Sequence, residues 1–199
     1  MAYQPFDLTG KTALVTGGNG GIGLGMADAM AQAGAKVCIW GTNAEKNDAA
    51  LEQLSTHGTE VAAMICDVSD EAQVEARFAE TVERFGNLFG VFANAGVSGG
   101  REQVPFVEMT TERWRQIVGV NLDGAFYTFR AAARHMMEHG EGGRITGTAS
   151  LAAISGAARN QHYAATKGGM VSMIYAMAVE LARFNITVNA ILPGWIETA

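Results

Sequence analysis

Tyr163 and Lys167 stand four residues apart in HYAATKGG, which leads into an Ala- and Met-rich run with helical spacing. Side chains four residues apart project from one face of a helix, so the phenol and the ammonium become neighbours. Tyrosine ordinarily has a pKa of about 10, but a cation about 4 Å away favours the phenolate by roughly 4 kcal/mol at an effective dielectric of about 20. The pair therefore predicts a general acid and base that works near neutral pH.

Ser150 lies before Tyr163 in the chain, at the end of the apolar segment RITGTAS (144–150). Its hydroxyl can donate to a substrate carbonyl oxygen while Tyr163 passes or takes the proton. His162 beside Tyr163 suggests an alternative, a Ser/His/Asp hydrolase, but Ser150 does not lie in a G-x-S-x-G nucleophile elbow. We therefore favour proton exchange at a carbonyl or alcohol over hydrolysis.

The glycine-rich segment TGGNGGIG (16–23) lies between a predicted strand, 11–16, and a predicted helix, 23–34. It fits G-x-G-x-x-G when read from Gly18 and T-G-x-x-x-G-x-G when read from Gly17. Glycines let the backbone approach a pyrophosphate, and a helix N-terminus offers free N–H groups and a partial positive charge. The turn predicts an anionic cofactor, with a tight turn that binds nothing as the alternative.

Strands and helices alternate along the chain, and apolar runs without interruption are typical of strands buried on both faces. We expect the other strands at 35–40, 61–68, 88–96, 144–150 and 186–192. We expect the other helices after Asn43, after Ser69, at 111–138 and at 163–183. This order predicts an α/β fold: a Rossmann-like, doubly wound parallel sheet with helices on both faces, formed by residues 1–199 as a single domain.

Composition narrows the class of protein. The 199 residues are 48% hydrophobic and 17% charged and carry a net charge of −6, without a long basic run, so we expect no nucleic-acid partner. No stretch approaches the roughly 20 apolar residues of a membrane span, so we expect no membrane partner and a cytoplasmic location. Cys38 and Cys66 are isolated in apolar contexts, which predicts buried free thiols and no metal site.

Several short motifs occur in a fixed order: Gly17, Gly21 and Gly23, then Asn94-Ala95-Gly96, Asn121, Ser150, Tyr163 with Lys167, and Pro193-Gly194. This order resembles the classical short-chain dehydrogenase/reductase family over essentially the whole chain. Each motif alone is weak, but their combination in register is specific. The resemblance implies an oxidoreductase that transfers a hydride between NAD(P)(H) and a carbonyl or secondary alcohol.

The resemblance also implies the site residues. It implies four catalytic residues. Ser150 polarises the substrate oxygen, and Tyr163 exchanges a proton with it. Lys167 lowers the pKa of the phenol and holds the ribose, and Asn121 supports Lys167 through water. Cofactor contacts fall on Gly17, Asn19, Gly21, Ile22, Gly23, Thr42, Asn43, Asp67, Val68, Asn94, Ala95, Gly96, Tyr163, Lys167, Pro193, Gly194, Ile196 and Thr198. Two alternatives stay open: Asp67 only ends its strand, and Asn121 is an ordinary polar helix residue.

The choice of cofactor depends on the end of the second strand. NAD-dependent relatives usually place an acid at the position of Gly41, and NADP-dependent ones a basic residue at Thr42 or Gly20. This chain has neither. Without an acid there is no repulsion of a 2′-phosphate, and Thr42, Asn43 and Lys46 offer donors and a charge, so we slightly favour NADP(H) over NAD(H).

Helices 111–138 and 163–183 carry more apolar residues than one sheet face needs, which predicts a homodimer or homotetramer, with deeper burial inside one subunit as the alternative. Two other functions stay open. One is a 3-oxoacyl-carrier-protein reductase, for which Arg101 and Arg159 would dock an acidic carrier. The other is a cofactor-binding module without turnover.

The last expectation concerns the end of the sequence. Members of the resembled family usually continue for about 50 residues beyond the P-G-x-x-x-T segment, through a substrate lid and a final strand. ITVNAIL would otherwise be an exposed sheet edge, which soluble proteins avoid. We therefore expect that the 199 residues are the N-terminal part of a longer chain.

Overall fold

The computed structural model describes residues 6–98 and 104–197. In this part of the chain one parallel sheet has the strand order β3-β2-β1-β4-β5-β6. The strands are β1 (Thr12–Thr16), β2 (Lys36–Gly41), β3 (Val61–Ile65), β4 (Gly90–Ala93), β5 (Gly143–Thr148) and β6 (Ile186–Ile191). The predicted doubly wound α/β fold is confirmed.

Helices connect the strands. The α-helices are α1 (Gly21–Gln32), α2 (Ala44–Ser55), α3 (Glu71–Phe85), α4 (Thr111–Val118), α5 (Gly124–His139), α6 (Ala152–Ser155) and α7 (Gln161–Leu181). The short turns η2 (Phe106–Glu108) and η4 (Ala182–Phe184) are 3-10 helices, and η3 (Gly119–Asp123) is a π-helix.

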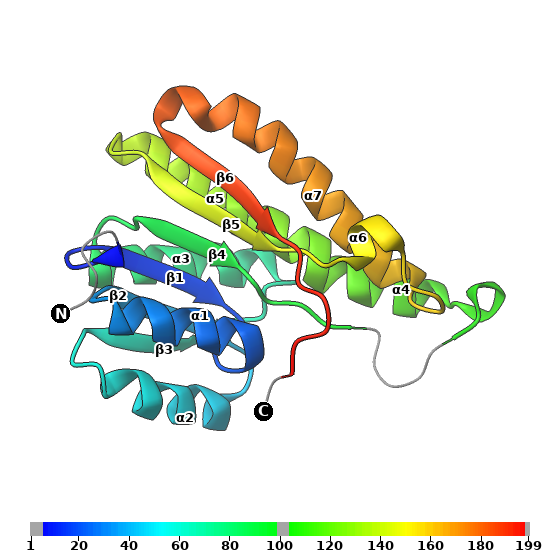
Figure 1. The fold of residues 1–199 in the computed structure, drawn as a ribbon, viewed down its shortest axis with the longest axis horizontal. Coiled ribbons are helices and arrows are strands. Elements are labelled where there is room, and N and C mark those ends of the chain that lie inside the picture. Colours follow the sequence, from blue (N-terminus) through cyan, green and yellow to red (C-terminus); the bar gives the residue numbers. More distant parts are fainter. Residues whose placement is uncertain (1–5, 99–103, 198–199) are drawn as a thin grey trace.

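Two apolar cores cover the two faces of the sheet. On one face, Ala27 and Ala31 of α1 and Leu54 of α2 pack on Val15 and Ile39 of the first two strands. On the other face, α3, α5 and α7 pack on all six strands through a larger set of buried residues. Figure 1 shows α1 in front of the sheet and α3 and α5 behind it. The predicted placement of helices on both faces is therefore correct.

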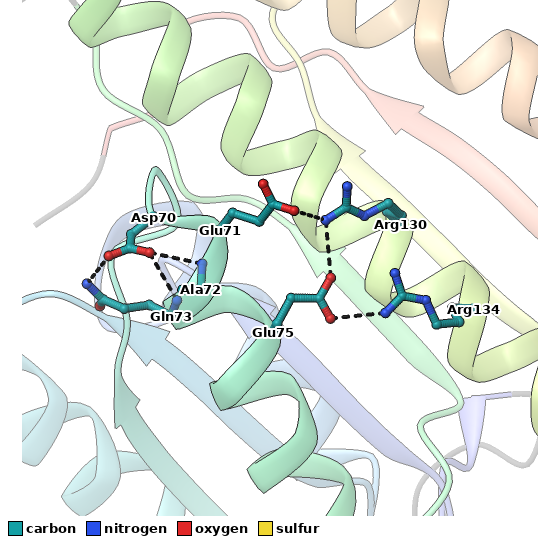
Figure 2. A network of polar contacts seen from close by, with 7 residues as sticks. All are labelled: Asp70, Glu71, Ala72, Gln73, Glu75, Arg130 and Arg134. Atoms are coloured by element: carbon teal, nitrogen blue, oxygen red, sulfur yellow. Dashed lines mark hydrogen bonds and ion pairs between the residues drawn. The ribbon is translucent and has the colours of Figure 1, made fainter.

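Ion pairs join α3 and α5 across the outside of the larger core. Arg130 donates to Glu71 at 2.6 Å and to Glu75 at 3.2 Å, and Arg134 donates to Glu75 at 3.1 Å, as Figure 2 shows. At the start of α3, Asp70 accepts hydrogen bonds from the first backbone N–H groups of the helix. The ion pairs stabilise the packing of α3 against α5, and the Asp70 bonds cap the start of α3.

The predicted long helix 111–138 stays helical throughout, but its geometry changes in the middle. A π-helical segment, Gly119–Asp123, separates α4 from α5, so one extra residue is inserted at that turn. Most strands are also shorter than the apolar runs predict, although β2 keeps its predicted length. For example, β4 ends at Ala93, and Asn94 begins the loop that follows it. At the sheet edge, β6 buries Ile186 and Val188 and exposes Thr187 and Asn189.

Candidate active site

A cleft of about 810 Å³ lies along the carboxyl ends of the strands. The strand order reverses between β1 and β4, and in doubly wound sheets this switch point is where ligands bind. The predicted site residues that line the cleft are Gly17, Asn19, Gly21, Ile22, Gly23, Thr42, Asp67, Val68, Asn94, Ala95, Gly96, Ser150, Tyr163, Lys167, Pro193, Gly194 and Ile196. The structure thus gathers side chains from sequence positions far apart into one hollow.

Some predicted residues stand apart from this lining. Asn43 is exposed, and its side chain accepts a hydrogen bond from Lys46 N at 2.8 Å as the N-cap of α2. Asn121 is buried one layer below the cleft. Thr198 and Arg101 lie outside the described residues. Trp195, which sequence reasoning did not single out, is fully exposed and lines the cleft; its place inside P-G-x-x-x-T is the signal that marks it.

The glycine turn leaves room for a ligand only because side chains are absent. Gly17 has a φ of +62°, and a Cβ there would lie 2.9 Å from Ala95 Cα. A Cβ at Gly23 would collide with the carbonyl oxygen of Gly17 and with Asn94 Nδ2. Only glycine meets both demands at this turn.

Asn94 holds that turn against the next strand. Its Nδ2 donates to the carbonyl oxygens of Thr16 and Gly17 at 3.1 and 3.2 Å, and its backbone N–H donates to Thr16 Oγ1 at 3.1 Å. At the N-cap of α1, Gly20 has no side chain to bond the first N–H groups of the helix. These residues fit the pyrophosphate of a dinucleotide, because open N–H donors at a helix start favour an anion.

Asp67 follows β3 at the same end of the sheet. Its Oδ1 accepts hydrogen bonds from the backbone N–H and the hydroxyl of Ser69, at 2.9 and 2.7 Å. The carboxylate therefore shapes the loop before α3, while the residue also lines the cleft. The sequence offers two interpretations, a residue that only ends its strand and a cofactor contact, and a position two residues after the end of β3 is compatible with both.

Asn121 lies in the π-helical segment and is fully buried. Its Oδ1 accepts from Val97 N at 2.8 Å and its Nδ2 donates to Val97 O at 2.9 Å, so both ends of the amide bond the loop after β4. A Cβ at Gly96 would lie 3.2 Å from Asn121 Oδ1 and 3.3 Å from Lys167 Nζ. The amide and the ammonium therefore meet around the same glycine.

Lys167 points into the floor of the cleft with 3% of its surface exposed. Its Nζ donates to the carbonyl oxygen of Thr148 at 2.7 Å and lies 5.7 Å from the centroid of the Tyr163 ring. Burial lowers the pKa of this ammonium to about 8. The helical spacing that the sequence predicts does bring the phenol and the ammonium together on one face of α7.

Ser150 follows β5, two residues after Thr148, whose carbonyl oxygen anchors Lys167. Its Oγ accepts a hydrogen bond from Ala152 N at 3.1 Å. A hydroxyl that accepts from the backbone keeps its own proton for another acceptor, which suits a donor to a carbonyl oxygen. His162 is buried and does not line the cleft, which leaves the hydrolase alternative without its base.

Cys38 and Cys66 are buried free thiols, as predicted, and burial raises their pKa values to about 11 and 12. Within residues 6–98 and 104–197 there is no cluster of His, Cys, Asp and Glu able to hold a metal ion. In the same part of the chain no helix has the length and apolarity needed to cross a bilayer.

The fold and the cleft together define a Rossmann-like dinucleotide-binding protein with a tyrosine–lysine pair at the switch point. A short chain dehydrogenase family model matches residues 11–199. L-rhamnose-1-dehydrogenase of Scheffersomyces stipitis is 39% identical over 197 residues, covering 96% of this chain and 75% of that protein. The 3-oxoacyl-[acyl-carrier-protein] reductase of Chlamydia pneumoniae is 35% identical, with the same coverage.

Solved structures agree. The crystal structure of levodione reductase has a TM-score of 0.92 and 37% identity, covering 96% of this chain and 74% of that one. The chain belongs to the short-chain dehydrogenase family, and it spans about three quarters of the length of these relatives. It is an oxidoreductase that uses NAD(P)(H) and acts on alcohol or carbonyl groups.

Proposed function

We propose that Ser150, Tyr163, Lys167 and Asn121 form the catalytic set of this oxidoreductase. The observation that carries the proposal is the convergence of Ser150, Tyr163 and Lys167 on one cleft, with Lys167 Nζ anchored to Thr148. When bound, the nicotinamide cofactor supplies or accepts the hydride.

The protein's own part is proton transfer and positioning. Ser150 donates a hydrogen bond to the substrate oxygen, and Tyr163 gives that oxygen a proton during reduction or takes it during oxidation. The buried ammonium of Lys167 stabilises the phenolate and holds the cofactor ribose. Asn121 fixes the loop at Val97 and supports Lys167 through water.

For the cofactor, we propose contacts at Gly17, Gly21, Gly23, Asp67 and Asn94, with the remaining contacts as the sequence implies. We also propose a preference for NADP(H) over NAD(H). Gly41 carries no acid, and Lys46, a few residues further along the chain, lines the cleft, so the end of β2 offers a 2′-phosphate a cation and no acidic side chain.

A substrate panel tests the activity. The absorbance of the reduced nicotinamide is followed with NAD⁺ or NADP⁺ and L-rhamnose or xylitol, and with NADH or NADPH and levodione. These compounds are taken from the names of relatives. Turnover of at least one alcohol or ketone is expected. Binding of cofactor with no turnover across a broad panel would instead favour a cofactor-binding module.

A second candidate is reduction of a 3-oxoacyl group on an acidic carrier protein, which the Chlamydia relative favours. Arg159 is exposed just before α7 and could contact an acidic partner. The net charge of −6 works against such docking. Reduction of a 3-oxoacyl thioester on carrier protein at a rate well above that of the free thioester would select this function.

We also propose a homodimer or homotetramer in the cytoplasm. Exposed apolar residues on α5 and α7 support assembly: Tyr175 is 70% exposed and Val179 83%. Light scattering of the purified protein measures the oligomeric state. The interpretation of residues 1–199 as a single domain that forms the N-terminal part of a longer chain stays a prediction, and the intact mass of the natural protein tests it.

A further inference from the structure

Asn47 is a buried amide on the sheet-facing side of α2, with 4% of its surface exposed. Its Nδ2 donates to the carbonyl oxygens of Gly41 at 3.4 Å and of Met64 at 3.3 Å. Its Oδ1 accepts from Asn19 Nδ2 at 2.7 Å. One side chain thus bonds the end of β2, the end of β3 and the glycine turn.

The hydrogen-bond network assigns the orientation of both amides. Backbone carbonyls only accept, so the NH₂ group of Asn47 faces them and its oxygen faces Asn19. Asn19 must then turn its own NH₂ group toward Asn47. That group keeps a second N–H, on a side chain that lines the cleft.

The Asn19 amide fills the space above Gly41. A Cβ at residue 41 would collide with Asn19 Nδ2 and would lie 2.5 Å from Asn19 Cγ and 2.6 Å from Asn47 Oδ1. Dinucleotide-binding sheets that bind NAD place an acid at the end of this strand to accept from the ribose 2′-hydroxyl. Here an N–H donor stands where that acceptor would stand.

We propose that Asn47 is a positioning residue for cofactor discrimination: it holds the Asn19 amide over Gly41 so that the ribose 2′ position meets a donor. The proposal rests on the proposed use of NAD(P)(H) at this cleft and deepens it. A phosphate oxygen accepts from a fixed N–H more strongly than a hydroxyl does, since its bond is charge-assisted. The orientation of Asn19 therefore favours the phosphorylated cofactor.

Removal of the Asn47 amide leaves the sheet largely paired. The carbonyl of Gly41 still accepts from Cys66 N at 3.2 Å, so Asn47→Leu deprives it of its weaker partner only. The change that matters for binding is the release of Asn19, whose side chain donates to Asn47 Oδ1 at 2.7 Å. A free amide rotates and presents its oxygen as readily as its nitrogen.

The experiment measures dissociation constants of NADP⁺ and NAD⁺ by isothermal titration calorimetry for the unchanged protein, Asn47→Leu and Asn19→Ala. We expect Asn47→Leu to weaken NADP⁺ binding about tenfold and NAD⁺ binding less than about threefold. Leu54→Val is the matched control, since it loosens the packing of the same helix without touching either amide. It should leave the ratio of the two constants unchanged.

A double-mutant cycle separates positioning from packing. In the Asn19→Ala background, Asn47→Leu should cause no further change in the ratio, because the group it positions is already absent. An unchanged ratio in Asn47→Leu, an equal change in Leu54→Val, or a full effect without Asn19 would each overturn the proposal. If Asn47→Leu does not fold, Asn47→Ala carries the same test.

The same data keep the two proposals apart. The ratio in the unchanged protein tests the preference for NADP(H), and tighter binding of NAD⁺ would contradict it. The change in that ratio on removing the Asn47 amide tests the positioning role, whichever cofactor binds more tightly at the start. Failure of both nucleotides to bind would overturn both.

Discussion

The Lys167 ammonium donates a hydrogen bond to the carbonyl oxygen of Thr148, the last residue of β5, at 2.7 Å. The contact ties the N-terminal part of α7 to the carboxyl end of β5, two residues before Ser150. It also holds a charge at a position with 3% exposure, where burial lowers its pKa to about 8. A cation buried there costs stability, and the proposed mechanism gives it a role in binding and catalysis.

Lys167→Met is therefore expected to stabilise the cofactor-free protein. The fall of the lysine pKa from 10.5 to about 8 corresponds to about 3 kcal/mol, from which the lost hydrogen bond to Thr148 removes about 1 kcal/mol. A gain of about 2 kcal/mol in the free energy of unfolding at pH 7 should follow, measured by urea titration.

The pH dependence checks the cause of that gain. Because the folded pKa lies below the unfolded one, the unfolded chain binds the extra proton between pH of about 8 and about 10.5. The stability of the unchanged protein should rise relative to Lys167→Met across this window. A gap between the two proteins that does not narrow would show that charge burial is not its source.

Tyr163→Phe is expected to lower kcat by about a hundredfold or more and to leave the affinity for the cofactor nearly intact, since only the proton path is lost. Steady-state rates with a substrate identified from the panel, together with cofactor titrations, measure the two effects. Tyr175→Phe is the matched control on the same helix, because that ring is 70% exposed and does not line the cleft. Loss of cofactor binding with an unchanged rate would sink the assignment.

Much of this site follows from the sequence because local rules fix it. The glycine turn at Gly17 to Gly23 and the Tyr163–Lys167 spacing depend on backbone freedom and helix period, which neighbouring residues determine. Family resemblance then places Ser150 and Asn121. The alternation of strand and helix patterns along the chain likewise predicts the parallel sheet.

Other features depend on contacts that no local pattern contains. The π-helical segment at Asn121 accompanies an amide that bonds the backbone of Val97, 24 residues away. The pair of Asn19 and Asn47 is separated by 28 residues, and Asn47 looks like a surface residue of a polar helix. Its signal in the sequence is weak: an amide three and seven residues before Ala50 and Leu54, which share its buried face.

Gly41→Asp is expected to shift the ratio of kcat/KM toward NAD by about tenfold or more, through repulsion of a 2′-phosphate and a new acceptor for the 2′-hydroxyl. The structure adds a cost, because the new Cβ meets Asn19 Cγ at 2.5 Å. Stability should fall by about 1 to 3 kcal/mol and recover only in part in Gly41→Asp with Asn19→Gly, because the Cβ still lies 2.6 Å from Asn47 Oδ1. If the ratio of kcat/KM for the two cofactors is the same in Gly41→Asp and in the unchanged protein, the proposed preference for NADP loses its support.

The buried environment of His135 leads us to expect that the protein loses stability in mild acid. Its Nε2 accepts from Leu88 N at 3.1 Å, and its ring lies against Phe78 and, at 4.8 Å between centroids, His139. Burial and then the charge of His139 lower its pKa below the usual 6.5, against a smaller opposite effect of Glu138. Protonation would also turn the acceptor into a donor and break the bond to Leu88.

The sign follows from where the proton binds first. The unfolded chain takes it up near pH 6.5, before the folded protein does, so the free energy of unfolding falls as the pH drops below about 6.5. His135→Gln keeps a polar group without the titration, and should flatten the slope between about pH 7.5 and pH 5.5 in urea titrations. Other groups also contribute to the pH dependence of the free energy of unfolding. Some slope should remain in His135→Gln, because burial also lowers the pKa of His162.

Asp28, whose pKa is lowered chiefly by its hydrogen bond to His57, loses its stabilising effect only in the more acidic range where carboxyl groups titrate. An undiminished slope in His135→Gln would therefore assign the acid sensitivity to another group.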